Sequence, residues 1–543
     1  MIVALCFLSA VALLVAVYRR YTRLTLADVP GPKAESFLLG NMRELMQGGA
    51  TEADTIWQRQ FGGVVKFKGP FGENRLMVSD PKALQHILHS SAYHYTKPNG
   101  FRKAIGRILN GNGLVAAEGD VHKRQRKAML PAFGGPESKA LFPVFKSISE
   151  GLVSHWNDVI SSSEDKASVV VNAPWWLSRA TLDAIGEAAF DYKFGALDDV
   201  DTQLKRAYSN IILTLFGNPS TPRVFLEACS EYLPTGPLVW LFNTLPFRRF
   251  VRLREACRAS VDTAASLVKE KGQALLEGRG NKDVMSLLVK ANASTNEKAK
   301  LTDDELYAEM RIILFAGHET TSNSLTLMLW ELAKNPQVQS RLRDEIRATE
   351  AAMRARGASE LTLADMENMH YLQAFLKEGL RFHPVASNMF RRATQDDVIP
   401  LSAPMRLSSG KVVGELTVPE GTSMILSVAA YNRDKNLWGE DADVFNPDRW
   451  LDGEGKEKKR IPVGVVGNLM TFSSGLRSCI GWRFAMTEMQ CFLVDLVSNF
   501  EFAIAYPEKR VRREGSGLMF PVVVGEEKDG VKLPLRISAA LRE

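Results

Sequence analysis

The stretch FSSGLRSCIG, from Phe472 to Gly481, combines residue types that can bind a metal ion. Cys479 lies between Gly475 and Gly481, which permit tight backbone turns. Arg477 stands two residues before it, and a nearby guanidinium favours the thiolate, the form that binds metals. Backbone N–H groups of such a turn can donate to the sulfur and tune it. A lone cysteine is more often a small buried apolar residue, so this interpretation needs support from elsewhere in the chain.

The remaining cysteines indicate neither a disulfide framework nor a zinc site. The chain has five, at Cys6, Cys229, Cys257, Cys479 and Cys491. Their number is odd and no C-x-x-C pair occurs. This usage is typical of a reducing compartment.

A long helix is predicted upstream of the cysteine loop. Thr302 and Glu305 have the spacing of a capping box, and the helical pattern continues to Lys334, where Asn335-Pro336 ends it. At about 1.5 Å per residue the helix is roughly 48 Å long, enough to cross a whole domain.

The middle of this helix, ILFAGHETTSNSL, is polar between apolar flanks. Gly317 weakens the helix and opens space, and the Thr320 hydroxyl lines that space or bonds back to the preceding turn. Glu319 supplies a carboxyl group that can move protons. An isolated threonine here usually marks only a kink, but the three residues together predict an oxygen-sized pocket with a proton source.

Two further groups of charged residues stand out. His122 and Arg126 share one helix face, which is either a basic solvated face or part of an anion site. Arg392 is another cation, after an apolar run. Cations that converge on a thiolate predict a bound group that carries carboxylates.

Glu378 and Arg381 lie three residues apart on a helix, and Arg449 is a candidate third member of their network. An exposed pair of this kind contributes little. A buried network would fix local geometry rather than add much stability.

Bulk properties exclude some functions. The 543 residues carry a formal net charge of +6 and are 45% hydrophobic, which is ample for a large core. The positive charges do not form a tract suited to nucleic acid, and a solvated surface or an acidic protein partner explains them better. No composition break divides the body of the chain into domains.

The N-terminal run Ile2 to Tyr18 is uncharged and is followed by Arg19, Arg20 and Arg23. We expect a retained membrane anchor with the body on the cytoplasmic side, because the arginines follow the apolar run. A cleaved signal peptide is the alternative, although its charges would precede that run. The prolines of Val29 to Lys33 are expected to stiffen the step to the globular body.

The body is predicted to be mainly helical with a small strand-rich part. Short strands are expected at VVKFKG and RLMVSD and a helix at Pro81 to Leu88. Leu233 to Phe250 is either a buried loop or an exposed patch that touches a membrane. The polar stretches Glu277 to Asp303 and Asp452 to Arg460 are expected to be solvated loops.

These residues match a known family: the chain resembles the cytochrome P-450 haem-thiolate monooxygenases over nearly all of its length. Ala316 to Thr321 fits the family's oxygen-activating helix, and Glu378 with Arg381 fits its E-x-x-R motif, with Arg449 as the usual partner. The haem-binding loop F-x-x-G-x-R-x-C-x-G is matched without a gap by Phe472, Gly475, Arg477, Cys479 and Gly481. The family commonly has tryptophan where His122 stands, but histidine can still donate to a haem propionate.

The resemblance implies a mainly α fold with a small β part, the cytochrome P-450 fold, behind an N-terminal transmembrane helix. It implies an anchor at residues 1–20, a proline-containing linker at 21–50 and a single haem-thiolate domain at 51–543. The expected location is the endoplasmic reticulum membrane, crossed once, with the catalytic domain in the cytoplasm.

The resemblance also implies residue roles. Cys479 would be the axial ligand of haem b, whose sulfur favours O–O cleavage. Thr320 would stabilise the oxygen intermediate while Glu319 helps to deliver protons, and Glu378, Arg381 and Arg449 would be structural. Propionate contacts are expected from His122, Arg126, Arg392 and Arg477, packing at the ligand loop from Phe472 and Gly481, and substrate contacts from Val115, Phe315, Ala316, Val385 and Leu518.

The implied reaction inserts one atom of O₂, by hydroxylation or epoxidation, into a lipophilic molecule such as a terpenoid or other secondary metabolite, as in fungal members. GNG at Gly111 to Gly113 does not follow a strand, so it is no nucleotide site. Electrons are therefore expected from a separate membrane-bound NADPH-dependent flavoprotein reductase, with cytochrome b5 as a second donor. Two alternatives remain: a haem-thiolate isomerase or dehydratase that needs no electrons, and a non-enzymatic membrane-tethered binding protein.

Overall fold

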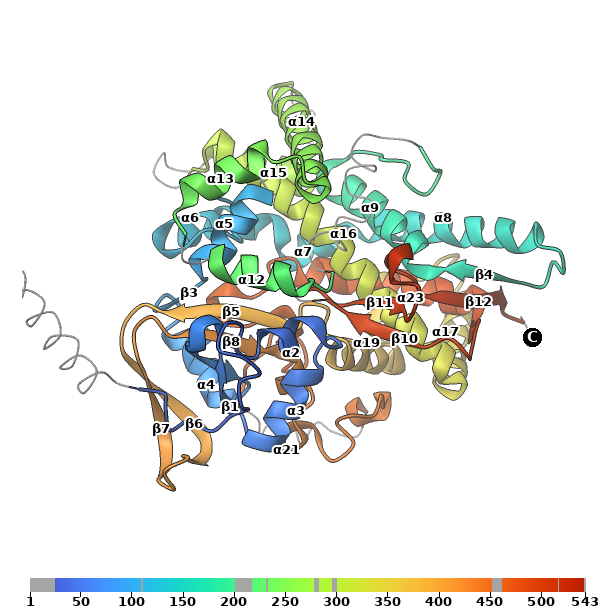
Figure 1. Cartoon of the computed structure of the whole chain (residues 1–543). Coiled ribbons are helices and arrows are strands. Elements are labelled where there is room, and N and C mark those ends of the chain that lie inside the picture. Colours follow the sequence, from blue (N-terminus) through green and yellow to red (C-terminus); the bar gives the residue numbers. More distant parts are fainter. Residues whose placement is uncertain are drawn as a thin grey trace, which may run out of the picture.

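The computed structural model describes residues 25–108, 111–200, 217–230, 233–277, 283–294, 300–451, 461–515 and 517–541. Helices make up most of this part of the chain, and the strands gather mainly toward one side and one end (Figure 1). The mainly α architecture with a minor β part is as predicted.

The helices are distributed along the whole described chain. Their bounds are α2 (Met42–Gln47), α3 (Glu52–Phe61), α4 (Pro81–Gln85), α5 (Asn99–Ile108), α6 (Gly119–Met129), α7 (Gly135–Ala140), α8 (Phe142–Ser161), α9 (Ala173–Phe190), α12 (Thr221–Ser230), α13 (Thr235–Thr244), α14 (Arg248–Leu276), α15 (Val284–Ser294), α16 (Asp303–Lys334), α17 (Pro336–Ala355), α18 (Leu363–Glu367), α19 (His370–Phe382), α20 (Val428–Asn432), α21 (Lys435–Trp438) and α23 (Trp482–Asn499). Short 3₁₀ turns η6 (Met470–Phe472) and η7 (Gly475–Arg477) precede Cys479.

Among the described residues the strands form four small sheets. The largest has the order β1-β2-β8-β5-β3, in which β2 and β8 are parallel and the other neighbours antiparallel. Its members are β1 (Val64–Lys68), β2 (Asn74–Val78), β3 (Tyr95–Thr96), β5 (Asn388–Ala393) and β8 (Ser423–Ser427). The smaller sheets consist of β4 (Ser168–Asn172), β12 (Pro534–Ala539) and β9 (Phe500–Ile504); β6 (Asp397–Arg406) and β7 (Val412–Val418); and β10 (Val511–Glu514) and β11 (Phe520–Val523).

Helix α16 is the central element of the helical part. It packs against α9 and α14 and also against α19 and α23, so it runs through the middle of the molecule (Figure 1). The predicted capping box is present: the Thr302 hydroxyl accepts from the Glu305 N–H at 3.2 Å, and the Glu305 carboxylate accepts from the Thr302 N–H at 3.0 Å. Asn335 ends the helix, as the Asn-Pro pair predicted. These signals fix both ends of α16.

The N-terminal part of the described chain is packed on the body. Leu26 and Val29 are buried, and the Lys66 N–H donates to the Pro30 carbonyl at 2.9 Å. Much of the segment expected to be a linker therefore belongs to the folded domain. The predicted anchor, Ile2 to Tyr18, lies outside the described residues. Within the ranges given above, no helix has the length and apolar character needed to cross a bilayer.

Two sequence expectations need correction or refinement. The stretch Glu277 to Asp303 was expected to be a solvated loop because of its polar composition, but it contains α15. That helix buries Val284, Met285 and Leu288, a short apolar face that the polar flanks conceal. Leu233 to Phe250 forms α13 and the start of α14, and Trp240 remains 64% exposed, which disfavours a buried loop.

Candidate active site

A cavity of about 360 Å³ lies between the middle of α16 and the loop that carries Cys479. Ala316, Gly317 and Thr320 of α16 form one wall, and η6, η7 and the start of α23 form another. Ile185 of α9 and Val385 complete an apolar part of the lining. The structure therefore brings the cysteine loop and the polar notch of the long helix to one site.

The loop around Cys479 is held in one conformation by close backbone contacts. Gly475 has a φ of +61°, and a Cβ there would lie 2.0 Å from the Leu88 carbonyl oxygen, so only glycine fits. The Cys479 N–H donates to the Phe472 carbonyl at 2.7 Å, which closes the turn. Cys479 has exposed surface although protein atoms surround it, and because it lines the cavity this surface opens into it.

The electrostatics of Cys479 differ in detail from expectation. Burial raises the pKa of its thiol, while the Gly481 N–H and the charge of Arg126 lower it. Arg126, rather than Arg477, is thus the cation that opposes the effect of burial. In the protein alone the net effect is a raised pKa of the Cys479 thiol. A bound metal cation would instead deprotonate a coordinating thiol.

Cations surround the cavity on the side of the cysteine loop. Arg126 donates to the Ser478 carbonyl at 2.8 Å and to its hydroxyl at 3.0 Å. Arg477 contacts the Glu118 carboxylate, but its Nε and Nη1 are buried and have no hydrogen-bond partner within the described residues. Burial, reinforced by the charge of Arg477, lowers the pKa of Arg391 to about 10. The buried Arg477 guanidinium, with two unused donors, therefore suits an anion.

His122 lines the same cavity as a neutral donor. Its Nδ1 lies 3.1 Å from the Tyr93 hydroxyl, and burial together with Lys97 and the nearby arginines lowers its pKa to about 3. It can donate to a carboxylate without adding to the positive charge. This geometry is compatible with the role expected at the position where the resembling family has tryptophan.

The expected cation Arg392 is replaced at the cavity by its neighbour. Arg391 is buried and lines the cavity, whereas the Arg392 side chain lies toward Gly421. Both belong to β5, and successive residues of a strand point to opposite faces. The apolar run alone did not define the phase of that alternation.

The donor set fits a haem, the group that the resemblance implies. In the part of the chain that the structure describes, no cluster of three or more His, Cys, Asp or Glu could enclose a bare metal ion. One cysteine sulfur, cations with unused donors and apolar walls instead suit a metal that brings its other ligands in a macrocycle with carboxylates. Lining residues that would hold it are His122, Arg126, Arg391, Phe472, Arg477, Cys479 and Gly481.

The polar notch of α16 is a series of hydroxyls bonded to the preceding turn. The Thr320 hydroxyl donates to the Ala316 carbonyl at 2.7 Å, and Thr321 donates to the Gly317 carbonyl at 3.2 Å. Gly317 does not simply open space, because a Cβ there would lie 2.6 Å from Cδ1 of Ile185. The glycine lets α9 approach α16 closely.

Glu319 lies beside this notch and is not one of the residues that line the cavity. Its carboxylate is 3.3 Å from Nε2 of His318, and the side chain is largely buried. A role in proton delivery stays a prediction, one that would require a connecting water or a change of rotamer.

The candidate substrate residues separate into two groups. Val115, Ala316 and Val385 line the cavity. Phe315 packs instead against Ile312 and Ala116, and Leu518 packs beside Val385, so each supports a lining residue from behind. Sequence patterns did not single out several further lining residues, among them Lys97, Ile185, Ile312, Arg391 and Met389.

Glu378, Arg381 and Arg449 form one buried network. Arg381 donates to both oxygens of Glu378 at 2.8 Å, and Arg449 donates to the same carboxylate at 3.1 Å. Arg381 also donates to the carbonyls of Asn432 and Ala442 at 2.9 and 2.7 Å. The network ties α19 to the chain that leads into the cysteine loop, which agrees with a structural role.

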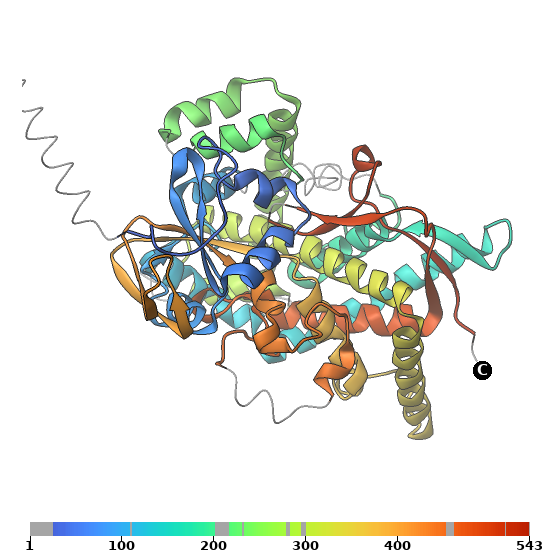
Figure 2. The same ribbon diagram turned by 60° about the horizontal axis from the view of Figure 1, so that its bottom comes forward.

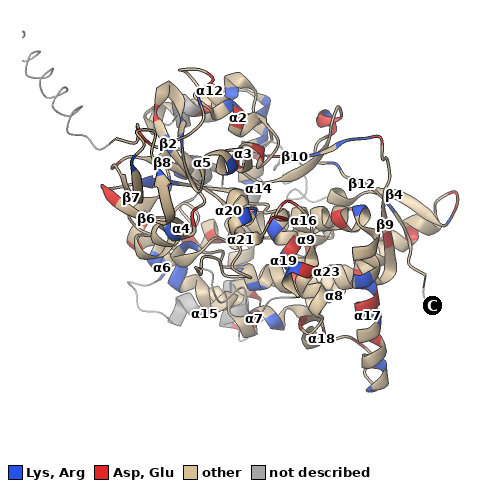
Figure 3. Ribbon diagram, turned by 90° about the horizontal axis from the view of Figure 1, so that it is seen from below, with Lys and Arg blue, Asp and Glu red and all other residues tan. Residues whose placement is uncertain are grey.

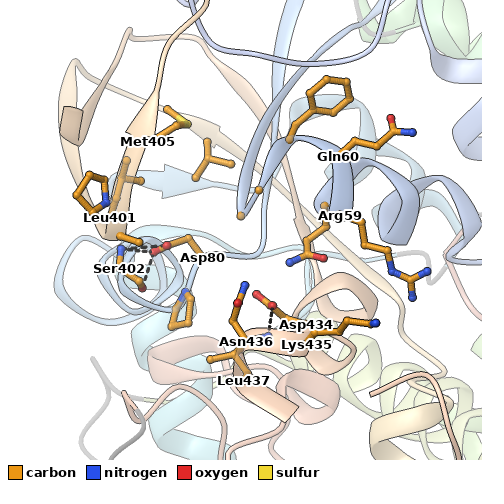
Figure 4. Close-up of a pocket in the computed structure, with 18 of the residues that line it drawn as sticks. Arg59, Gln60, Asp80, Leu401, Ser402, Met405, Asp434, Lys435, Asn436 and Leu437 are labelled. Atoms are coloured by element: carbon orange, nitrogen blue, oxygen red, sulfur yellow. Dashed lines mark hydrogen bonds between the residues drawn. The ribbon is translucent and has the colours of Figure 1, made fainter. Parts of the chain in front are cut away.

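A second hollow, of about 960 Å³, lies between α3, β6 and α21 (Figure 4). Its carboxylates already accept protein hydrogen bonds: Asp80 from Ser402 at 2.9 Å, and Asp434 from the Asn436 N–H at 2.9 Å. This hollow lacks the thiol and the uncompensated cations of the first cavity. The chemistry belongs to the cavity at Cys479.

Comparison with known proteins agrees with this assignment. A family model described as Cytochrome P450 matches residues 29–526. Cytochrome P450 monooxygenase 205 of Postia placenta is 33% identical over 98% of this chain and 97% of that protein. Cytochrome P450 monooxygenase claW of Ampulloclitocybe clavipes is 30% identical over 96% and 94%, and the ganoderic acid synthetase CYP5150L8 of Ganoderma lucidum is 31% identical over 95% and 94%.

One buried carboxyl near the cavity makes stability depend on pH. Burial raises the pKa of Glu309 on α16 to about 8. In the folded protein Glu309 therefore keeps a proton that it loses in the unfolded chain above its ordinary pKa of 4.5. Its contribution to the free energy of unfolding is complete below pH 4.5 and is lost as the pH rises through about 8. We expect Glu309→Gln, which does not ionise, to gain melting temperature relative to the wild type between pH 5 and 8. A constant difference across that range would contradict the burial argument.

Proposed function

The chain belongs to the cytochrome P450 family and is a haem-dependent monooxygenase, and from this premise we propose that it oxidises a lipophilic secondary metabolite. One atom of O₂ is inserted by hydroxylation or epoxidation, and electrons are the other co-substrate. The observation that carries the proposal is the cavity in which an apolar wall of α9 and α16 faces the Cys479 loop. Haem b, when bound, supplies the oxidising power.

The residues of this chain supply binding, orientation and dryness. Cys479 offers the sulfur ligand from a loop whose backbone is fixed by its bond to Phe472. Arg126, Arg391 and Arg477 supply charge for the carboxylates, and His122 adds a neutral donor. The Thr320 hydroxyl lines the cavity, so its Oγ1 can hold a proton there and exchange it with a neighbour.

The names of the relatives support the substrate class. One is named a ganoderic acid synthetase, and the cavity lining includes Ile185, Ile312, Val115 and Val385. We infer a lipophilic substrate of the secondary-metabolite or terpenoid kind. Product analysis after co-expression with a reductase, using a panel of such molecules, tests this. Turnover of the panel without reductase would favour an isomerase or dehydratase instead.

The role of the Cys479 sulfur can be tested by substitution. Cys479→Ala is expected to lose monooxygenase activity and the red-shifted Soret band that thiolate-bound haem gives with carbon monoxide after reduction. Among the described lining residues, the other sulfurs are methionine thioethers. Cys491→Ala is the matched control, since that cysteine is fully buried in α23 away from the cavity lining. The proposal fails if the Cys479 variant keeps both the band and the activity.

We further propose that a separate NADPH-dependent flavoprotein reductase docks beside the cysteine loop, with cytochrome b5 as a second donor. Exposed Arg483 at the start of α23 follows that loop in sequence, and exposed Lys127 of α6 is next to Arg126, which donates to Ser478 of the loop. Figure 3 shows basic residues on α6. Complementary charge chiefly accelerates association and is screened by salt.

The expected result for Lys127→Glu with Arg483→Glu is slower reduction by the reductase at low ionic strength, with a smaller difference from the wild type at high salt. Reduction by dithionite, which needs no docking, serves as the control and should be unchanged. Equal reduction rates with the reductase at low ionic strength would place the docking face elsewhere.

Membrane attachment is proposed from the N-terminal run Ile2 to Tyr18 and from exposed apolar side chains of the body. Leu226 of α12 and Trp240 of α13 are 66% and 64% exposed. Helix α12 packs against α2 beside the N-terminal elements (Figure 2), and the rings of Phe71 and Phe225 are 6.5 Å apart between centroids. We infer a single pass through the endoplasmic reticulum membrane, with the catalytic domain in the cytoplasm.

A chain lacking residues 1–20 is expected to keep its haem spectrum and to bind phospholipid vesicles more weakly. Leu226→Asp with Trp240→Asp in that shortened chain should reduce the remaining binding further, because both side chains lose their apolar surface. Vesicle flotation measures both effects. Full vesicle binding by the shortened double variant would contradict the proposed surface.

A further inference from the structure

The segment from Gly111 to Ala117 forms one wall of the cavity without being a helix or a strand. Leu114 and Val115 line the cavity from this segment. Irregular backbone at a binding site needs hydrogen-bond partners from elsewhere, because a buried peptide group left unpaired is costly. What holds the segment therefore determines the shape of the wall.

The two glycines of GNG are explained by the way the segment lies on α16. A Cβ on Gly111 would be 2.6 Å from Cβ of Ala308, and one on Gly113 would be 2.5 Å from Cδ1 of Ile312. Both distances are too short for a side chain. The motif thus lets the backbone lie flat on the helix that also carries Thr320.

Two buried ionisable residues bind the backbone of the segment from opposite directions. Glu309 of α16 accepts from the Leu114 N–H at 2.8 Å through its Oε1. Lys97, directly after β3, donates to the Leu114 carbonyl at 3.3 Å and to the Ala117 carbonyl at 3.1 Å. Glu309 is fully buried and Lys97 is 9% exposed. Leu114 is therefore held at both its N–H and its carbonyl.

Other contacts to the segment come from α5 and α6. Arg102 donates to the Ala116 carbonyl at 3.0 Å, and Gln125 donates to the Asn112 carbonyl at 2.8 Å. Neither side chain contacts Leu114, which lines the cavity. Glu309 and Lys97 are the two side chains whose loss would release it.

We propose that Glu309 and Lys97 are positioning residues that fix Leu114 and Val115 as a rigid wall and so select which lipophilic molecules fit. The inference rests on the proposed function in one respect, that the substrate lies between α16 and this segment. Loss of either side chain leaves backbone groups of Leu114 unpaired in a buried place, and the segment relaxes away from α16. Glu309 does not line the cavity that would hold the haem, so its replacement should leave the sulfur ligation unchanged, whereas Lys97 does line it.

The test compares two imidazoles that bind haem iron through the same nitrogen. 1-Dodecylimidazole extends an alkyl chain along the cavity wall, whereas imidazole itself reaches no further than the iron. We expect Glu309→Leu and Lys97→Met to weaken 1-dodecylimidazole about tenfold, the loss expected for one buried hydrogen bond. Imidazole affinity should be unchanged in Glu309→Leu, because that side chain does not line the cavity, and should fall less than 1-dodecylimidazole affinity in Lys97→Met. Glu309→Gln keeps the acceptor oxygen and is the matched control, with wild-type affinity for both ligands.

Hydrogen–deuterium exchange on the haem-loaded full-length chain provides an independent readout. The Leu114 amide should be protected in the wild type and in Glu309→Gln, and should exchange rapidly in Glu309→Leu. If Glu309→Leu fails to bind haem, two measurements still test the proposal. These are the 1-dodecylimidazole affinity of Lys97→Met and the exchange rate of the Leu114 amide in the wild type.

Three results would overturn the inference: unchanged 1-dodecylimidazole affinity in Lys97→Met or Glu309→Leu, equal weakening of imidazole, or rapid exchange at Leu114 in the wild type. A wild-type protein without the thiolate-haem spectrum would instead refute the proposed function. The two failures are therefore distinguishable.

Discussion

The structure depends on one electrostatic constraint: three guanidinium groups line the cavity of the Cys479 thiol, and within the described residues only one carboxylate pairs with them. Arg126, Arg391 and Arg477 face one cavity, and Glu118 is the carboxylate that contacts Arg477. An uncompensated buried charge costs several kcal/mol even after the protein relaxes. These arginines would bind the carboxylates of a haem, and Cys479 would be held deprotonated by its iron. Binding of the cofactor would thus also neutralise the arginine charges that line the cavity.

The remainder of the fold keeps the sulfur and α16 at opposite walls of the cavity. The Glu378 network ties α19 to the chain before the cysteine loop, and the packing of Gly475 on the Leu88 carbonyl fixes the loop itself. On the other wall, α9 approaches α16 closely at Gly317. Rigid walls suit a reaction in which the substrate must be held still and kept dry beside a strong oxidant.

Sequence patterns predicted the parts of this structure that depend on local chemistry. The capping box and Asn-Pro stop defined α16 because caps act within one turn, and the cysteine loop was visible in its glycines. The sequence indicated Arg392 and not Arg391, because neighbouring residues of a strand point to opposite faces of the sheet. Which of the two faces the cavity depends on how β5 pairs with β8. The contact between Glu309 and Leu114 joins residues 195 positions apart, and that between Lys97 and Leu114 joins residues 17 apart, and no local period records either.

The most direct test of the central claim is X-ray absorption at the iron edge of the purified, haem-loaded protein. The account predicts one sulfur scatterer in the first shell together with the porphyrin nitrogens, lost when Cys479 is replaced by serine. A first shell of nitrogen and oxygen scatterers alone in the wild type would contradict it.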